Sequence, residues 1–313
     1  MDLYPTPENP LPRGAVAVPV TTRDGVILRA MKAVQPRSKG TVVVLGGRGD
    51  FIERYFETAR DLMVRGYSVA MLDVRGQGGS QRLLGNPMRC YIQTFADFDE
   101  DLRAFMTQIV LPDCPPPYFV LAHSTGGNIL LHSLRTRAWF SKAVVVSPLI
   151  GIVYGSWPLP FVRPLVFLAT NLGLGWMFLP GQQRKPLGRK DFSQNLLTSD
   201  QQRWNRDSGV LEAAPQLGLG GPTFSWLKAA MKSTAALKAL GPKDNLCCPV
   251  LIVAAGLDRV VDNEAIRRFA KTVSGVSLVF VKESQHEILS EADAIRAQFF
   301  AAFDAFVGGR QPG

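Results

Sequence analysis

Residues 118–127 read Tyr-Phe-Val-Leu-Ala-His-Ser-Thr-Gly-Gly, an apolar run that ends on a serine among small residues. A serine becomes a useful nucleophile when a sharp turn from a strand into a helix holds its hydroxyl exposed, in a strained backbone conformation. The usual pattern has glycine two positions before and two positions after that serine. Around Ser124 these positions hold Ala122 and Gly126. The stretch predicts such a turn, and the competing interpretation is a buried strand followed by a helix that Ser124 merely caps.

The composition indicates a protein with a large core. The chain has 313 residues, of which 46% are hydrophobic, enough for one core or for a core with an inserted subdomain. Its four cysteines and three histidines lack the spacing of a zinc site, so we expect no metal. The first residues have neither the basic nor the apolar region of a secretory signal. We therefore expect reduced cysteines and a cytoplasmic protein, at most peripheral to the inner face of the membrane.

The formal net charge of +9 is spread along the chain. The densest basic group, at residues 184–190, contains a proline and a glycine and has no nucleic-acid-binding motif or interleaved aromatic residues. We interpret it as a solvated loop and expect no nucleic-acid partner. Attraction to anionic membrane surfaces is the second interpretation of the charge.

Short apolar runs rich in β-branched residues alternate with amphipathic helical patterns, which predicts a mostly parallel sheet covered on both faces. Asp24-Gly25, between the first two runs, is a hairpin signal, so that edge should be antiparallel. The alternation breaks between residues 148 and 228, and we expect core residues 1–147, an insertion at 148–228 and core residues 229–313. The expected strands are 15–20, 26–33, 41–45, 68–73, 117–122, 142–147, 249–254 and 277–281, and the expected helices are 52–65, 94–110, 126–136, 262–272 and 292–307.

A nucleophilic serine needs a base, and the chain offers three histidines. His123 adjoins Ser124, but alternating side-chain directions should aim it away from the serine hydroxyl. His132 lies about two helical turns further on and is expected to pack within a helix. His286 follows the strand at 276–281 by a short polar loop, which places it at the carboxyl edge of the sheet, where ligand sites form. We therefore predict His286 as the base.

The base must be oriented by a carboxylate. Asp258 directly follows the buried strand at 249–254, and the segment from there to His286 has room for one helix and one strand. The competing acid is Asp262, which precedes the helix start at residues 263–266 and is better explained as a helix cap. We therefore predict Asp258 as the orienting acid.

Further motifs lie at residues 46–55 (Gly-Gly-Arg-Gly-Asp-Phe-Ile-Glu-Arg-Tyr), 72–82 (Leu-Asp-Val-Arg-Gly-Gln-Gly-Gly-Ser-Gln-Arg) and 284–287 (Ser-Gln-His-Glu). With residues 122–127, they resemble the α/β-hydrolases of the serine aminopeptidase S33 type, in the group of bacterial lysophospholipase L2 and monoacylglycerol lipase. The resemblance extends over about residues 15–307. It implies an α/β-hydrolase fold, with a mostly parallel eight-stranded sheet, helices on both faces and an inserted, mainly helical lid at 148–228.

The resemblance also implies a mechanism. Ser124, Asp258 and His286 occur in the chain order of this fold, and the implied reaction is hydrolysis of a carboxylic ester through an acyl-enzyme, without a cofactor. By alignment with related hydrolases, Gly-Gly replaces a His-Gly pair in the loop after the third strand. The backbone N–H groups of Arg48 and Thr125 are then the expected oxyanion hole.

The insertion bears on the substrate. Residues 165–179 are apolar and uncharged, but this run of 15 is shorter than the about 20 residues that cross a bilayer. We interpret the run as an apolar lid over a fatty-acyl tunnel, able to touch a membrane surface transiently. We expect substrate contacts from Gly47, His123, Trp157 and Trp176, and a lipid-like ester as substrate, either a lysophospholipid or a monoacylglycerol.

Two other functions fit the same residues. An aminopeptidase or another acyl-transfer enzyme would use the same three side chains, but it would need acidic groups to hold a substrate amine, and residues 148–190 are poor in them. A non-catalytic binding protein on this scaffold would usually have lost one of the three.

Overall fold

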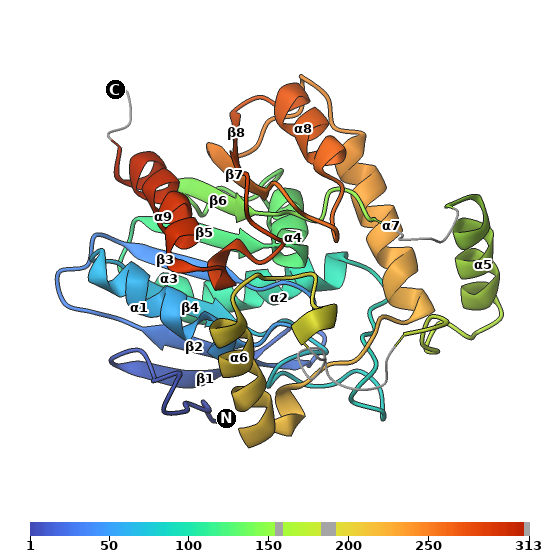
Figure 1. Cartoon of the computed structure of the whole chain (residues 1–313), viewed down its shortest axis with the longest axis horizontal. Helices are drawn as coiled ribbons and strands as arrows, with labels where there is room; N and C mark the ends of the chain where they lie inside the picture. Colours follow the sequence, from blue (N-terminus) through green and yellow to red (C-terminus); the bar gives the residue numbers. More distant parts are fainter. Residues whose placement is uncertain (154–158, 183–191, 310–313) are drawn as a thin grey trace.

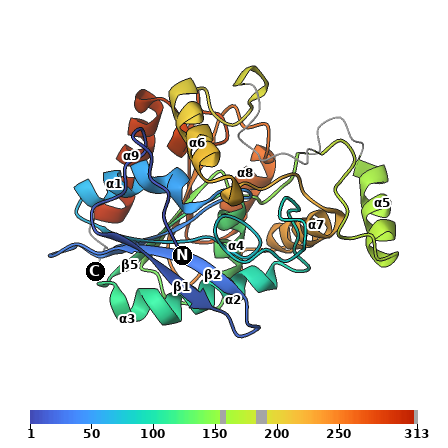
Figure 2. The same ribbon diagram turned by 90° about the horizontal axis from the view of Figure 1, so that it is seen from below.

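The computed structural model describes residues 1–153, 159–182 and 192–309 (Figures 1 and 2). Trp157 and the basic group at 184–190 lie outside these residues, so both predictions remain untested. Within the described chain, a central sheet is covered by helices on both faces, and part of the insertion extends to one side (Figure 1).

The sheet has eight strands in the order β1-β2-β4-β3-β5-β6-β7-β8. The first two form the predicted antiparallel hairpin, β2 also pairs antiparallel with β4, and the pairs from β4 onward are parallel. The predicted mostly parallel eight-stranded sheet is confirmed. The strands are β1 (Ala15–Thr21), β2 (Ile27–Ala33), β3 (Thr41–Leu45), β4 (Ser68–Leu72), β5 (Tyr118–His123), β6 (Lys142–Val146), β7 (Val250–Ala255) and β8 (Val276–Val281).

Helices pack on both faces of the sheet. Two of them, α1 and α9, cover one face through side chains that include Phe56 and Phe303, and α2, α4, α7 and α8 cover the other. The helices are α1 (Phe56–Val64), α2 (Ala96–Phe105), α3 (Leu111–Asp113), α4 (Thr125–Ser133), α5 (Leu159–Asn171), α6 (Gln201–Ala213), α7 (Phe224–Lys238), α8 (Asn263–Thr272) and α9 (Asp293–Gly308). Shorter turns are η1 (Ile52–Tyr55), η2 (Met106–Val110), η3 (Phe192–Gln194), η4 (Pro215–Leu217) and η5 (Ile288–Ser290).

The apolar runs form strands because both faces of the sheet are buried. Every residue of β3, β4, β6 and β7 is buried, which is the pattern of a parallel sheet between two helical layers. Parallel strands end at one common edge. The loops after β3, β5, β7 and β8, which carry the predicted site residues, therefore meet there.

The segment between β6 and β7 contains α5, α6 and α7. Helix α5 rests on α7, where Val162 and Val166 pack against Phe224 and Leu227, and it projects from the side of the molecule (Figures 1 and 2). Because α7 runs from 224 to 238, it crosses the boundary expected at residue 228. The three-part division of the chain remains a prediction. In the described residues, no helix combines the length and apolar character needed to cross a membrane.

Candidate active site

The predicted turn lies between β5 and α4. Ser124 has φ +51° and ψ −112°, in the left-handed range that residues with a side chain rarely adopt. Its backbone N–H donates to the carbonyl of Val146, and its carbonyl accepts from Asn128 and Leu149. Neighbouring elements on both sides therefore hold the serine in this strained conformation, at the carboxyl edge of the sheet.

The two small residues around the serine have different environments. A Cβ atom on Gly126 would lie 2.5 Å from the carbonyl oxygen of Leu45, so this position requires glycine. Ala122 is fully buried within β5, opposite Leu45 on one neighbouring strand and Val145 on the other. Its methyl group occupies an ordinary strand position, which explains why alanine is tolerated there.

The structure brings Ser124, His286 and Asp258 together. Nε2 of His286 lies 3.0 Å from Oγ of Ser124, and Nδ1 of His286 lies 2.7 Å from Oδ2 of Asp258. With Nδ1–H donating to Asp258, Nε2 is free to accept the serine hydroxyl proton. Ser124 and His286 are only 7% and 3% exposed. The three side chains form one hydrogen-bonded chain, largely shielded from solvent.

Asp258 is held as a carboxylate. Burial raises its pKa, but the hydrogen bond and charge of His286 and the amides of Val261 and Val260 outweigh burial and leave the pKa below its ordinary value. The competing acid, Asp262, instead caps α8 by accepting from the amides of Glu264 and Ala265 at 2.9 and 3.2 Å. Asp262 therefore has the capping geometry predicted from its position in the sequence.

The other two histidines lie away from the serine hydroxyl. Nε2 of His132 contacts Ser233, between α4 and α7. His123 faces Asp50, with Nδ1 3.4 Å from Oδ2, and its ring centroid lies 4.9 Å from that of His286. Burial lowers the pKa of His123, but the hydrogen bond and charge of Asp50 outweigh it and raise the pKa above its ordinary value.

The loop after β3 lies directly beside Ser124. A Cβ atom on Gly47 would be 3.1 Å from Cβ of Ser124 and 3.1 Å from Nδ1 of His123. The Gly47 N–H donates to Asp50 at 2.6 Å, while the side chain of Gln77 bonds the Gly47 carbonyl and the Gly49 N–H. Gln77 belongs to the Arg-Gly-Gln motif, which thus shapes this loop.

Two backbone N–H groups remain candidates for the predicted oxyanion hole. That of Arg48 has no hydrogen-bond acceptor in the described residues. The Thr125 N–H belongs to the first residue of α4. Amides at this end of a helix have no partner inside the helix, and the helix dipole favours negative charge there. Both belong to segments that contact Ser124.

A cavity of about 480 Å³ opens in front of Ser124, Thr125 and His286. Part of its wall is apolar and comes from the segment between β6 and β7, including Leu149, Ile152, Val162, Val166, Phe224 and Trp226. His123 also lines it. Trp176 lies outside its wall, 42% exposed, with its ring 4.5 Å from the guanidinium carbon of Arg89. Its predicted substrate contact has no support from this placement.

The wall also contains a largely buried charge cluster. Arg54 of η1 bonds Asp50, Asp207 of α6 and Glu287, with Nε 3.0 Å from Oδ2 of Asp207. Burial lowers the pKa of Arg54, but the three carboxylates outweigh burial and raise it well above its ordinary value. The sequence interpretation missed this cluster. Arg54 lay inside a motif quoted for the family resemblance, but nothing in the sequence indicated its partners.

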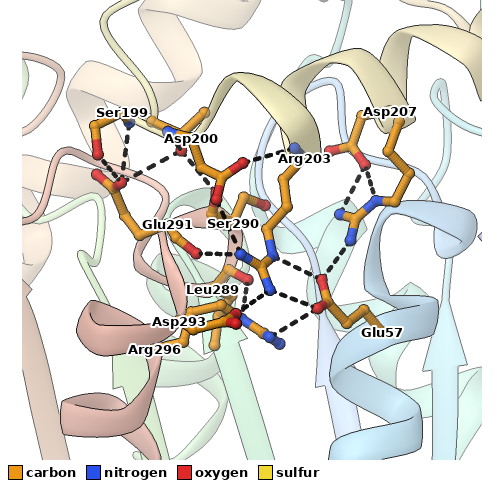
Figure 3. Close-up of polar contacts among 12 residues, drawn as sticks. Glu57, Ser199, Asp200, Arg203, Asp207, Leu289, Ser290, Glu291, Asp293 and Arg296 are labelled. Carbon is orange, nitrogen blue, oxygen red and sulfur yellow. Dashed lines mark hydrogen bonds and ion pairs between the residues drawn. The ribbon is translucent and has the colours of Figure 1, made fainter. Parts of the chain in front are cut away.

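A second ionic network fixes α6 to the core (Figure 3). Its centre is Glu57 of α1, which bonds Arg203 and Arg206 of α6 and Arg296 of α9. Distances from Glu57 Oε1 are 2.7 Å to Nη2 of Arg203 and 2.9 Å to Nη1 of Arg296. Burial raises the pKa of Glu57, but the arginines, led by the hydrogen bond from Arg203, hold it at about 2. Helix α6 is thereby joined to both helices on one face of the sheet.

The residues before α6 also contact the loop that carries His286. The carbonyl of Leu197 accepts from the Glu287 N–H at 2.7 Å, and Glu291 accepts from the amide and the hydroxyl of Ser199 (Figure 3). The histidine loop is therefore supported from the segment between β6 and β7 as well as from the core.

One family of known proteins matches most of this chain. The model of the family described as serine aminopeptidase, S33, matches residues 36–293. The chain belongs to this family. The resemblance predicted from the motifs is confirmed, and the chain is a carboxylic ester hydrolase with the α/β-hydrolase fold.

Members similar to this chain include lysophospholipase L2 of Escherichia coli strain K12, which is 31% identical over 289 residues, covering 88% of this chain and 82% of that protein. Probable lysophospholipase L2 of Haemophilus influenzae is 25% identical over 279 residues, which cover 88% of this chain and 86% of that protein. Among solved structures, the monoglyceride lipase of Saccharomyces cerevisiae, a soluble variant bound to a substrate analogue, matches with a TM-score of 0.72 at 20% identity, covering 98% of each chain. The Paleococcus ferrophilus monoacylglycerol lipase matches with a TM-score of 0.70 at 19% identity, and the match covers 90% of this chain and 98% of that lipase. At these identities the two structures support the fold.

Proposed function

We propose that this chain hydrolyses carboxylic esters of lipid-like substrates, lysophospholipids or monoacylglycerols, through an acyl-enzyme on Ser124. The observation that carries the proposal is the hydrogen-bonded chain from Ser124 through His286 to Asp258, which opens onto a cavity with an apolar wall. A nucleophile, a base and an orienting acid in this arrangement suit acyl transfer. An apolar cavity wall suits a fatty-acyl chain.

In the first half of the reaction, Oγ of Ser124 attacks the ester carbonyl carbon while Nε2 of His286 takes the hydroxyl proton. Asp258 keeps the imidazole oriented through Nδ1 and stabilises its positive charge. The carbonyl oxygen becomes an oxyanion, which the N–H groups of Arg48 and Thr125 stabilise. The tetrahedral intermediate then loses the alcohol, whose oxygen receives the proton from His286.

The second half repeats these steps with water. His286 takes a proton from a water molecule, whose oxygen attacks the acyl carbon. When this intermediate collapses, the proton returns to Oγ of Ser124 and the fatty acid leaves. Every proton passes through Nε2 of His286, and the reaction requires no cofactor.

The segment between β6 and β7 is proposed as a lid over the acyl chain. Val162 and Val166 of α5 line the cavity, whereas Phe161 and Phe167 of the same helix are 71% and 62% exposed. One face of α5 would contact the acyl chain and the other would touch a lipid surface transiently. Gly47 and His123 remain proposed substrate contacts beside Ser124.

An aminopeptidase activity has less support. It needs a carboxylate available for the ammonium group of a substrate. The cavity-lining carboxylates of Asp50, Asp207 and Glu287 all bind Arg54.

The decisive experiment compares wild-type protein and Ser124→Ala on p-nitrophenyl esters of graded chain length, long-chain monoacylglycerols, lysophospholipids and an amino-acid p-nitroanilide. We expect wild-type activity to rise with acyl-chain length and to be absent on the anilide. Activity of the Ser124→Ala variant equal to wild type would refute the mechanism. Much faster cleavage of short soluble esters than of long-chain lipids would refute the acyl tunnel. Failure of wild-type protein to react with a fluorophosphonate probe would indicate a non-catalytic protein.

A further inference from the structure

The cationic side chains around the cavity differ in their ionic partners. Arg54 is satisfied by three carboxylates. Arg48 and Arg259 also line the cavity, and neither forms an ion pair within the part of the chain that the structure describes. Arg259 is exposed to solvent, whereas Arg48 is partly buried. The cavity therefore contains one partly buried guanidinium that lacks a counter-ion among the described residues.

One donor of the Arg48 guanidinium has no hydrogen-bond partner in the described residues. Its guanidinium carbon lies 5.5 Å from the ring centroid of Trp226, and its Nη1 is buried without a hydrogen-bond partner in the described residues. It also contacts the thiol of Cys90. Burial raises the pKa of that thiol to about 11, although Arg48 itself lowers it, so Cys90 stays neutral and supplies no negative charge. A buried guanidinium donor without an acceptor is unfavourable, and a ligand that supplies an anionic oxygen relieves this.

The position of Arg48 relative to Ser124 indicates which part of a substrate it would meet. Arg48 follows Gly47, which lies against Ser124, and its backbone N–H is the proposed oxyanion donor. Its side chain thus starts beside the reacting carbonyl and reaches at most one extended arginine side-chain length from it. In a monoacyl glycerophospholipid, the glycerol backbone separates the ester carbonyl from the phosphate by a comparable length. The planar fork of a guanidinium matches two phosphate oxygens.

We propose that the side chain of Arg48 binds the phosphate of a lysophospholipid head group while the N–H of the same residue faces the ester carbonyl. Arg48 is then a specificity-determining residue, which favours phosphate-bearing substrates over neutral glycerides with the same acyl chain. Arg259 adds a second positive charge at the same cavity. Arg54 contributes little because its donors are already bound. This inference rests on the proposed ester hydrolysis at Ser124.

The test begins with wild-type protein and two ether analogues that cannot be hydrolysed, 1-O-hexadecylglycerol 3-phosphate and 1-O-hexadecylglycerol, in the same neutral detergent. Each is measured as an inhibitor of p-nitrophenyl ester hydrolysis. We expect the phosphate to lower the inhibition constant by about tenfold or more, as charge-assisted hydrogen bonds do. Equal inhibition constants would overturn the proposal.

The second experiment uses two variants. Arg48→Met removes the charge and keeps an unbranched side chain, and Arg48→Lys keeps the charge but lacks the planar guanidinium with its paired donors. The readout is the ratio of kcat/KM for 1-palmitoyl lysophosphatidylglycerol to that for 1-palmitoylglycerol. We expect Arg48→Met to lower this ratio by roughly tenfold to a hundredfold and Arg48→Lys to lower it less. Arg268→Met, an exposed change on α8, serves as the control and should leave the ratio unchanged.

The outcomes separate the two proposals. If wild-type protein cleaves neither lipid, the proposed function fails. If it cleaves both and Arg48→Met changes the two kcat/KM values by the same factor, ester hydrolysis stands and the phosphate site is refuted. If Arg48→Met does not fold, the wild-type inhibition constants decide.

Discussion

Arg54 and Glu287 form a largely buried ion pair, and Glu287 is the residue directly after His286 in the chain. The same guanidinium also binds Asp50, in the loop after β3, and Asp207, on α6. One arginine therefore joins the loop after β3, the histidine loop and the segment between β6 and β7. The relative positions of the proposed reacting groups depend on this side chain, although we assign it no contact with the reacting atoms.

Removal of this arginine should destabilise the protein strongly. Arg54→Met leaves three carboxylates together without their common partner, and breaking a buried ion pair from one side costs about 3–5 kcal/mol. We expect the free energy of unfolding in urea to fall by that amount, and Arg54→Lys to cost less because it keeps the charge. Arg268→Met is the control, with an expected change within about 0.5 kcal/mol. A loss below about 1 kcal/mol for Arg54→Met would show that the cluster tolerates the unpaired charges.

The two candidate acids can be separated by substitution. We expect Asp258→Asn to lower kcat by about four orders of magnitude, because the amide favours the wrong tautomer of His286. Asp262→Ala removes only the cap of α8, so it should cost about 1 kcal/mol of stability and leave kcat/KM within a few-fold of wild type. Steady-state kinetics and urea unfolding of both variants check this. If Asp262→Ala showed the larger kinetic loss, the assignment of the orienting acid would be wrong.

The turn at Ser124 makes a prediction about its two small neighbours. Gly126→Ala places a methyl group against the backbone of Leu45, where the clash distance is 2.5 Å. We expect it to cost at least about 1–3 kcal/mol and most of the activity, because a backbone carbonyl cannot move aside easily. Ala122→Gly restores the more usual pattern but removes a buried methyl group from a strand, so it should cost about 1 kcal/mol without abolishing activity. Thermal unfolding and kcat/KM of both variants provide the comparison.

The ionic network around Glu57 makes stability depend on acid pH. Since the pKa of Glu57 falls from 4.5 to about 2 on folding, its contribution is fully present above about pH 4.5 and is lost as the pH falls toward 2. We expect the free energy of unfolding of wild-type protein to decrease over this range. Glu57→Gln should be less stable at pH 7 and show a shallower decrease on acidification. Parallel curves for the two proteins would contradict the assigned linkage.

The outer face of α5 should bind lipid surfaces. Phe161, Phe167 and Leu168 are 71%, 62% and 57% exposed, and replacing all three by serine removes apolar area that a lipid surface would bury. We expect binding to phosphatidylcholine vesicles containing phosphatidylglycerol to weaken by at least about tenfold in co-sedimentation. Val64→Ser is a matched control, because Val64 is 87% exposed on α1, away from this face. Equal vesicle binding by the triple variant and wild type would exclude α5 as the contact.

The sheet and the proposed reacting residues could be predicted from sequence because their signals are local. Buried parallel strands are continuous apolar runs, and Ser124, Asp258 and His286 each follow such a run directly or after a short loop. Ala122 looked like a departure from the usual motif, but its methyl group is an ordinary part of β5.

The Arg54 cluster could not be predicted in this way. Two of its partners are 153 and 233 residues away in the chain. Neither a periodic pattern nor a short motif indicates which carboxylates will lie next to one guanidinium in the folded protein. The same limit applies to Trp176, whose aromatic character suggested a place in the cavity wall, while the fold stacks it on Arg89.

Helices α5 and α6 are attached to the rest of the protein in different ways, and this affects how easily each of them can change. Helix α6 is tied by ion pairs to α1, to α9 and, through Asp207, to Arg54, so a change there would disturb the histidine loop as well. Helix α5 rests on α7 through a small apolar contact. Mutations that lengthen, shorten or replace α5 should therefore cost the rest of the protein little stability.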